Sequence, residues 1–81
     1  MTPRQPHGEH STWTGPTLRW CREHLGLTRA ELGAALGITG TEVYRKERGD
    51  RPIMRAQEQA VRWLLHKAGY SDAEIEEMTH E

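Results

Sequence analysis

Two arginines in the middle of the chain could recognise nucleic acid. Arg45 and Arg48 lie three positions apart and follow small polar residues at positions 39–41. On a helix this spacing places both guanidinium groups on one face. A guanidinium group can donate two hydrogen bonds to O6 and N7 of guanine, worth about 1–3 kcal/mol of discrimination between bases, or it can bind a phosphate. These residues therefore favour contact with double-stranded DNA.

Two short helices joined by a tight turn would position these arginines. Thr28 and Glu31 have the spacing of a capping box, which predicts the start of one helix, and Thr39 and Glu42 predict the start of the next. Gly37 lies between them and permits the positive φ that a sharp turn requires. This is the layout of a helix-turn-helix, whose second helix lies in the DNA major groove.

Three further helices are expected, so the sequence predicts an all-α chain of five short helices. The first begins near Thr14, whose hydroxyl can cap free backbone N–H groups. The fourth runs over about 53–68. Its apolar face comprises Ala56, Ala60, Val61, Leu64 and Leu65. Ser71 and Glu74 form a third capping box and start a short acidic helix.

The charge is distributed unevenly along the 81 residues, although the net charge is only −1. Residues 17–55 carry eight basic and five acidic side chains, whereas residues 56–81 carry two basic and six acidic ones. A basic centre suits a polyanion, although ordinary solvated surfaces would give similar counts. We expect one domain with a flexible N-terminal arm over 1–13, a DNA-binding region over 14–68, and a short acidic helix within 69–81 as a candidate dimerisation element.

The residue types needed for catalysis or metal binding lack a suitable arrangement. The sequence contains no Ser-His or Cys-His constellation, HExxH motif or glycine-rich phosphate loop, and His24, His66 and His80 lack metal-ligand spacing. Cys21 falls on an apolar stripe and is expected to be a small buried residue. No apolar run is long enough for a membrane span, and no secretory signal is recognised. We expect a cytoplasmic, non-enzymatic protein with no cofactor and no small-molecule substrate.

A set of residues between Thr14 and Leu65 follows one spacing pattern. It consists of Leu18, Arg22-Glu23, Gly26-Leu27-Thr28, Glu31-Leu32-Gly33, Gly37-Ile38-Thr39 and Val43 to Gly49. In this pattern the chain resembles the Cro/repressor-like helix-turn-helix family, also called the XRE family. The resemblance implies a lambda-repressor-like domain, here with a helical extension at its C-terminal end. In its small size the chain also resembles the anti-CRISPR-associated autorepressors of phages and, less closely, antitoxin regulators.

The resemblance implies which side chains contact DNA. Thr28 and Arg29 correspond to positions that contact phosphate, and Arg48 and Arg51 correspond to positions near the DNA backbone. The resemblance places six residues at the start and on the outer, DNA-facing side of the third helix: Thr39, Gly40, Thr41, Glu42, Tyr44 and Arg45. A glutamate here can accept a hydrogen bond from the amino group of cytosine or only cap its own helix. Gly40 has no side chain, which leaves Thr41, Glu42 and Arg45 as the main candidates for base recognition.

The resemblance also implies a buried ion pair and shows one departure. Arg22 and Glu47 correspond to a pair between the first and third helices, which makes Arg22 structural. Losing one partner of such a pair costs roughly 3–5 kcal/mol when the pair is buried. Lys46 stands where the family prefers an aromatic or aliphatic residue, so we expect Trp20 or Trp63 to supply core packing instead.

Together these features predict a sequence-specific transcriptional regulator. We expect a repressor that binds an inverted-repeat operator as a homodimer, with its third helices about 34 Å apart, one turn of DNA. The residues expected at the dimer interface are Trp63, Leu64, Tyr70, Ile75 and Met78. For Trp63 a place in the core is an equal alternative. The alternative function is a protein-binding antitoxin or adaptor that uses the same fold.

Overall fold

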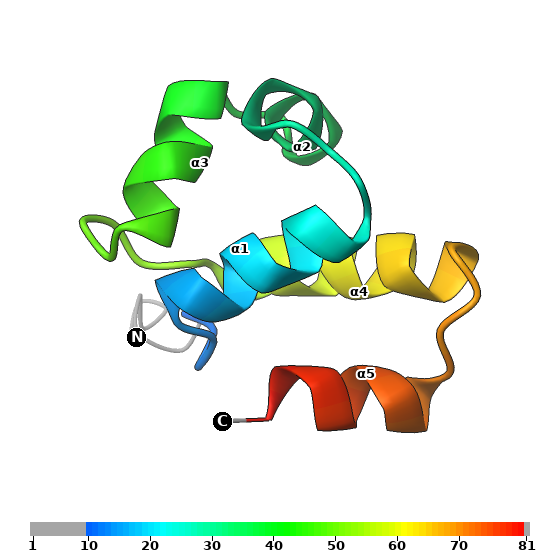
Figure 1. The fold of residues 1–81 in the computed structure, drawn as a ribbon. Coiled ribbons are helices and arrows are strands. Elements are labelled where there is room, and N and C mark those ends of the chain that lie inside the picture. The colour runs from blue at the N-terminus through cyan, green and yellow to red at the C-terminus, as the bar shows by residue number, and fades with distance from the viewer. Residues whose placement is uncertain (1–9, 81) are drawn as a thin grey trace, which may run out of the picture.

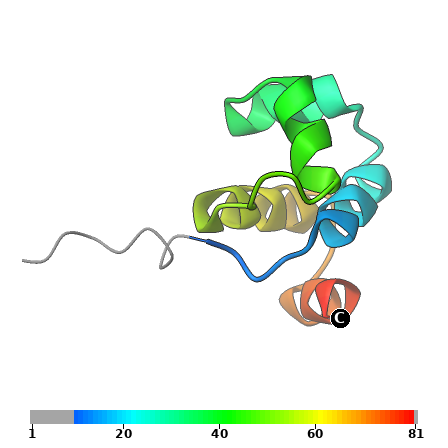
Figure 2. The same cartoon turned by 90° about the vertical axis from the view of Figure 1, so that its left-hand side faces the viewer.

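The computed structural model describes residues 10–80, which form five α-helices and no strand. The helices are α1 (Gly15–His24), α2 (Arg29–Leu36), α3 (Gly40–Glu47), α4 (Arg55–Lys67) and α5 (Asp72–Thr79). α2 and α3 lie together on one side of α1 and α4, and α5 lies on the opposite side (Figures 1 and 2). This arrangement confirms the prediction of an all-α chain with five helices.

Side-chain oxygens cap the starts of four helices. The capping residues Thr14, Thr28, Thr39 and Ser71 each accept a hydrogen bond from the backbone N–H group three positions further on. At the last three sites a glutamate accepts a hydrogen bond in return from the N–H group of the capping residue, which completes the three predicted capping boxes. These caps satisfy N–H groups that have no partner inside the helix.

α4 begins later than the sequence predicted. Residues 53–54 are extended, because they pair with the chain that precedes α1 rather than entering the helix. Ser11 N donates to the carbonyl oxygen of Ile53 at 2.7 Å, and His10 forms an antiparallel bridge with Met54. The Gln57 side chain accepts a hydrogen bond from Met54 N at 2.9 Å and holds the start of α4.

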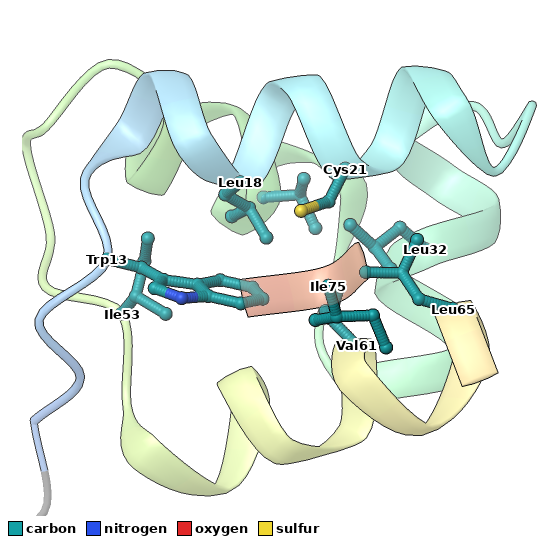
Figure 3. Close-up of a cluster of buried hydrophobic side chains, with 9 residues drawn as sticks. Trp13, Leu18, Cys21, Leu32, Ile53, Val61, Leu65 and Ile75 are labelled. Atoms are coloured by element: carbon teal, nitrogen blue, oxygen red, sulfur yellow. The ribbon is translucent and has the colours of Figure 1, made fainter. Parts of the chain in front are cut away.

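One hydrophobic core joins all five helices. Its buried members are Trp13, Leu18, Cys21, Leu32, Val43, Ile53, Val61, Leu65 and Ile75. Figure 3 shows side chains from α1, α2, α4, α5 and the connecting segments converging on this cluster. Burial of a valine, leucine or isoleucine side chain contributes roughly 1.5–3 kcal/mol to folding stability. The burial of this cluster therefore supplies most of the stabilisation that holds the short helices together.

Trp13 belongs to this core, which corrects the N-terminal boundary expected from the sequence. Its side chain is buried, and the guanidinium carbon of Arg62 lies 5.5 Å from its ring centroid. The expectation of a flexible arm over 1–13 is therefore wrong for 10–13, which pack against α4. The remainder of that expected arm, 1–9, lies outside the described residues.

The tryptophan in the core is not one of the two that the sequence favoured. Trp20 and Trp63 are both exposed, Trp63 to 59%. Lys46 is nevertheless buried, because its amino group donates to the carbonyl oxygen of Pro52 at 2.8 Å while its alkyl stem lies inside. The packing expected from Trp20 or Trp63 is thus supplied by Trp13 and by the lysine stem.

α5 is docked firmly on the rest of the chain. Ile75 is only 1% exposed and Thr79 only 7% exposed. Arg62 of α4 pairs with Glu76 at 2.8 Å. The prediction that Ile75 forms a dimer interface is wrong, because the core of its own chain encloses it.

Ala56 was expected on the apolar face of α4, but it is exposed.

Two glycines help to orient α3, Gly37 by permitting a sharp turn and Gly15 by permitting a close approach. Gly37 has φ of 77°, in the left-handed region, and ends α2 with the sharp turn that the sequence predicted. Gly15 begins α1 directly beside the end of α3. A Cβ atom at Gly15 would meet the carbonyl oxygen of Glu47 and would lie 2.7 Å from that of Lys46. α1 therefore supports the last turn of α3.

Candidate nucleic-acid interface

α3 presents a polar outer side to solvent. Its inward side chain Val43 is fully buried and fixes the rotation of the helix. The exposed side chains of α3 and its C-cap are Thr41, Glu42, Tyr44, Arg45 and Arg48. α2 and α3 lie away from the acidic helix α5 in both views (Figures 1 and 2). The basic and acidic parts of the chain are thus separated in space as well as in sequence.

A buried carboxylate joins three helices behind this face. Glu47, whose side chain is 3% exposed, accepts hydrogen bonds from Arg22 Nε at 2.6 Å and from Arg22 Nη2 at 3.3 Å. Arg22 Nη1 also donates to the carbonyl oxygen of Leu27 at 2.9 Å. The pair that the resemblance implied is therefore present. Arg29 Nε donates to the same carboxylate at 3.1 Å, although the sequence predicted only phosphate contact for Arg29.

Tyr44 lies between two of the predicted phosphate-binding arginines. The guanidinium carbons of Arg29 and Arg48 are 5.1 Å and 5.6 Å from the centroid of its ring. Arg48 Nη1 also donates to the Tyr44 hydroxyl at 3.4 Å, and Arg48 Nε pairs with Asp50 at 3.6 Å. The hydrogen bond with Tyr44 and the nearby Asp50 raise the pKa of Arg48. This cluster was not predicted as a unit.

Arg45 and Arg51 are free by comparison. Within the described residues neither side chain has a hydrogen bond or an ion pair, and both residues are exposed. They line a hollow of about 240 Å³ whose other walls are Glu42, Lys46, Pro52 and Met54. Burial lowers the pKa of Lys46, and the charge of Arg51 acts in the same direction, against the opposing effect of Glu42. The hollow is therefore a concentration of positive charge beside α3.

Three of the predicted DNA-contacting residues at the start of α3 have structural tasks. The Glu42 carboxylate accepts a hydrogen bond from Thr39 N at 3.1 Å, and Thr39 Oγ1 accepts one from Glu42 N at 3.0 Å. The sequence left two roles open for Glu42, contact with a cytosine or capping of its own helix, and in the structure its carboxylate caps the helix. Gly40 is turned toward α2, since a Cβ atom there would lie 3.1 Å from the Ala30 Cα atom. Close packing of α2 on α3 explains Gly40 better than contact with a base.

The remaining predicted interface residues lie elsewhere. Leu64 is half-buried on α4, next to the exposed Trp63. Tyr70 and Met78 line a hollow of about 560 Å³ together with Trp20, His24, Glu74 and Glu77. A backbone hydrogen bond from Ser71 lowers the pKa of Glu74, so its carboxylate stays charged at neutral pH. This second hollow is therefore acidic.

Other kinds of site find no support in the described part of the chain. Residues 10–80 hold no group of three side chains that could bind a metal ion. None of the helices in that range has the length and apolar character needed to cross a bilayer. Cys21 is fully buried, and burial raises the pKa of its thiol to about 11, as suits a core residue.

Sequence reasoning missed the place of Lys46 in the wall of the hollow beside α3 and the place of Arg29 in the ion-pair cluster. A signal for Lys46 was available, because a lysine at a position that favours an aromatic residue must bring its amino group to a polar partner. No comparable signal exists for Arg29. Its contact with Glu47 spans 18 positions and depends on the angle between two helices.

Comparison with known protein families agrees with this geometry. The pattern of a helix-turn-helix domain matches residues 14–78, a range that begins at the cap of α1 and ends inside α5. Neither the curated proteins nor the solved structures gave a match. The matched range contains the capped pair α2–α3, its glycine turn and the Arg22–Glu47 pair, and it covers most of the chain. The protein belongs to the helix-turn-helix domain family.

Proposed function

We propose that this protein binds double-stranded DNA by placing the outer side of α3 in the major groove. The observation that carries the proposal is the free guanidinium group of Arg45, which is exposed on α3 and unpaired within the described residues. Such a group can donate both hydrogen bonds to a guanine without breaking a contact inside the protein. The major groove is wide enough to admit an α-helix.

Side chains around α3 would position the domain on the DNA backbone. Thr28 and Arg29 at the start of α2, with Arg48 and Arg51 after α3, surround the helix with groups that bind phosphate. Thr41 is exposed on the first turn of α3 and suits a phosphate or a thymine methyl group. Phosphate contacts carry little sequence information, so Arg45 and Thr41 are the main candidates for base recognition.

A transcriptional regulator, and specifically a repressor, is the role that we infer for such a protein. It would act in the cytoplasm of a bacterium or of a phage-infected cell. Two copies related by a two-fold axis would place their α3 helices about 34 Å apart, in successive major grooves on one side of an inverted repeat. The small core of a chain of this length and the exposed Trp63 support self-association.

Selection of bound fragments from random DNA, followed by fluorescence anisotropy, tests this proposal. We expect the selected fragments to share an inverted repeat. Affinity for them should fall as salt rises, because phosphate contacts release counterions, and should resist competitor DNA. No enrichment of any sequence, with no salt-sensitive binding, would reject the DNA-binding role and favour the protein-binding adaptor.

A further inference from the structure

Tyr44 connects two arginines that come from different helices. Arg29 opens α2, and Arg48 is the C-cap of α3. Both guanidinium groups lie within cation–π range of the Tyr44 ring, at 5.1 Å and 5.6 Å from its centroid. Tyr44 is itself 41% exposed and has little to pack against in the core. Within the described residues its cation–π contacts and its side-chain hydrogen bond are with these two arginines.

Each arginine is also held by a carboxylate on its Nε atom. Arg29 Nε donates to Glu47, which is buried and fixed in turn by Arg22, and Arg48 Nε faces Asp50 at 3.6 Å. The terminal nitrogens of Arg29 have no hydrogen-bond partner within the described residues, and Arg48 Nη1 donates only to the Tyr44 hydroxyl. The buried Glu47 thus holds the near end of the Arg29 guanidinium, the exposed Asp50 lies near that of Arg48, and the Tyr44 ring lies beside both groups. Terminal N–H groups remain free for a ligand.

We propose that Tyr44 is a positioning residue: its ring holds Arg29 and Arg48 ready to bind backbone phosphates of DNA. This inference rests on the proposed function and gives Tyr44 a role other than base recognition. An arginine loses much rotational freedom when it binds a phosphate, and restraint in the free protein removes part of that cost. The guanidinium groups and the hydrogen bond from Arg48 already engage the ring and its hydroxyl, which disfavours a direct contact with a base.

Two substitutions separate the ring from its hydroxyl group. Tyr44→Phe keeps the ring and should stay within about twofold of the wild-type affinity, because stacking on the arginines is retained. Tyr44→Leu removes the ring and should weaken binding about 3–10-fold. That loss should be the same for a selected fragment and for random DNA, and the preferred sequence should not change. Equal damage from both substitutions would overturn the proposal in favour of a hydroxyl contact.

A double-mutant cycle with Arg48→Ala tests whether Tyr44 acts through the arginines. We expect Tyr44→Leu to cost clearly less in the Arg48→Ala protein than in the wild type. Additive losses, or a changed base preference in Tyr44→Leu, would overturn the positioning role. If the wild-type protein does not bind DNA at all, the proposed function fails. If the wild type binds and the cycle is additive, only the role of Tyr44 fails.

A measurement without DNA makes the test independent of binding. The terminal Nη–Hη groups of Arg29 and Arg48 can be followed by NMR in the free protein. Their heteronuclear NOE should fall in Tyr44→Leu and persist in Tyr44→Phe, since the ring restricts both side chains. Unchanged values in Tyr44→Leu would overturn the proposal. Because Tyr44 is exposed, thermal unfolding should shift only slightly, and this confirms that the variants are folded.

Discussion

The arginines of this protein are distinguished by their partners more than by their positions in the sequence. Arg22 is committed to Glu47, whereas Arg29 and Arg48 are restrained and partly free. Arg45 has no partner within the described residues, although it lies only one position from Tyr44 on the same helix. Their side chains are chemically identical, so their different roles follow from the partners that each side chain contacts.

Replacing Arg45 should affect base recognition specifically. Arg45→Ala is expected to cost about 1–3 kcal/mol of binding to a selected fragment and to relax its base preference, because a bidentate contact with guanine is lost. Arg48→Ala should weaken binding to all DNA about equally and reduce the salt dependence, since it removes a phosphate contact. Anisotropy on selected and random fragments compares the two. Wild-type affinity in both variants would mean that the recognition face lies elsewhere.

Replacing Glu47 should destabilise the fold. Glu47→Gln leaves the buried Arg22 without its counter-charge, and we expect the free energy of unfolding to fall by about 3 kcal/mol. Urea denaturation followed by circular dichroism measures this. Glu23→Gln is the matched control, because the Arg19–Glu23 pair is largely exposed and should contribute less than about 1 kcal/mol. Similar effects from both substitutions would argue against a structural role for the buried pair.

The thiol of Cys21 should report on opening of the core. It is fully buried and its pKa is raised to about 11, so the reactive thiolate is scarce at pH 8. We expect negligible reaction with a disulfide reagent in the native protein and rapid reaction of one thiol per chain in denaturant. A fast reaction of the native protein would show that the hydrophobic core does not enclose this residue in solution.

At the scale of the helices, their order and the starts that carry a capping box were predictable from sequence, but the start of α4 and the contacts between helices were not. The Thr28, Thr39 and Ser71 capping boxes are local, so the residues alone place those helix starts within one position. The burial of Trp13 depends on the pairing of 10–11 with 53–54, a long-range contact that leaves no periodic signal. The enclosure of Ile75 likewise depends on how α5 docks, which its amphipathic pattern does not define.

The approach of α1 to α3 makes Gly15 a sensitive position. Gly15→Ala introduces a Cβ atom where the backbone carbonyl groups of Lys46 and Glu47 lie, and backbone atoms can move aside only with the whole helix. We expect a loss of about 1–3 kcal/mol, typical of overpacking, although alanine is the better helix former. Thermal unfolding tests this. The control Arg19→Ala, at an exposed position of α1, should change stability by less than about 1 kcal/mol.

At the scale of the whole molecule, the fold separates opposite charges. Three of the four charged side chains that line the hollow beside α3 are basic, whereas α5, with Glu74, Glu76 and Glu77 exposed, lies on the other side of α1 and α4 (Figure 2). A net charge of −1 therefore does not oppose DNA binding, because the field near α3 is set by its own side chains within a Debye length of about 8–10 Å. The acidic side is also a poor surface for self-association, because two copies would bring like charges together.

This charge separation favours Trp63 over Tyr70 and Met78 as the centre of a dimer. Trp63 is 59% exposed on α4, and the Lys67 amino group lies 5.9 Å from its ring centroid, so its surroundings are not acidic. Burial of an exposed tryptophan between two copies would supply much of the association energy. We expect the wild type to sediment as a dimer and to bind two half-sites more tightly than one. Trp63→Ser should be monomeric, folded by circular dichroism, and unable to distinguish the two fragments, and its thermal unfolding should no longer depend on protein concentration.

The other exposed tryptophan provides the matched control for the dimer. Trp20→Ser alters the acidic hollow beside α5 and should leave the dimer intact, because like charges keep that side apart. Sedimentation velocity at several protein concentrations compares the three proteins. If Trp20→Ser dissociates the dimer while Trp63→Ser does not, the interface lies on the acidic side and association should strengthen as the carboxylates are protonated. A wild type that sediments as a monomer and binds one half-site as tightly as two would rule out the two-fold arrangement on DNA.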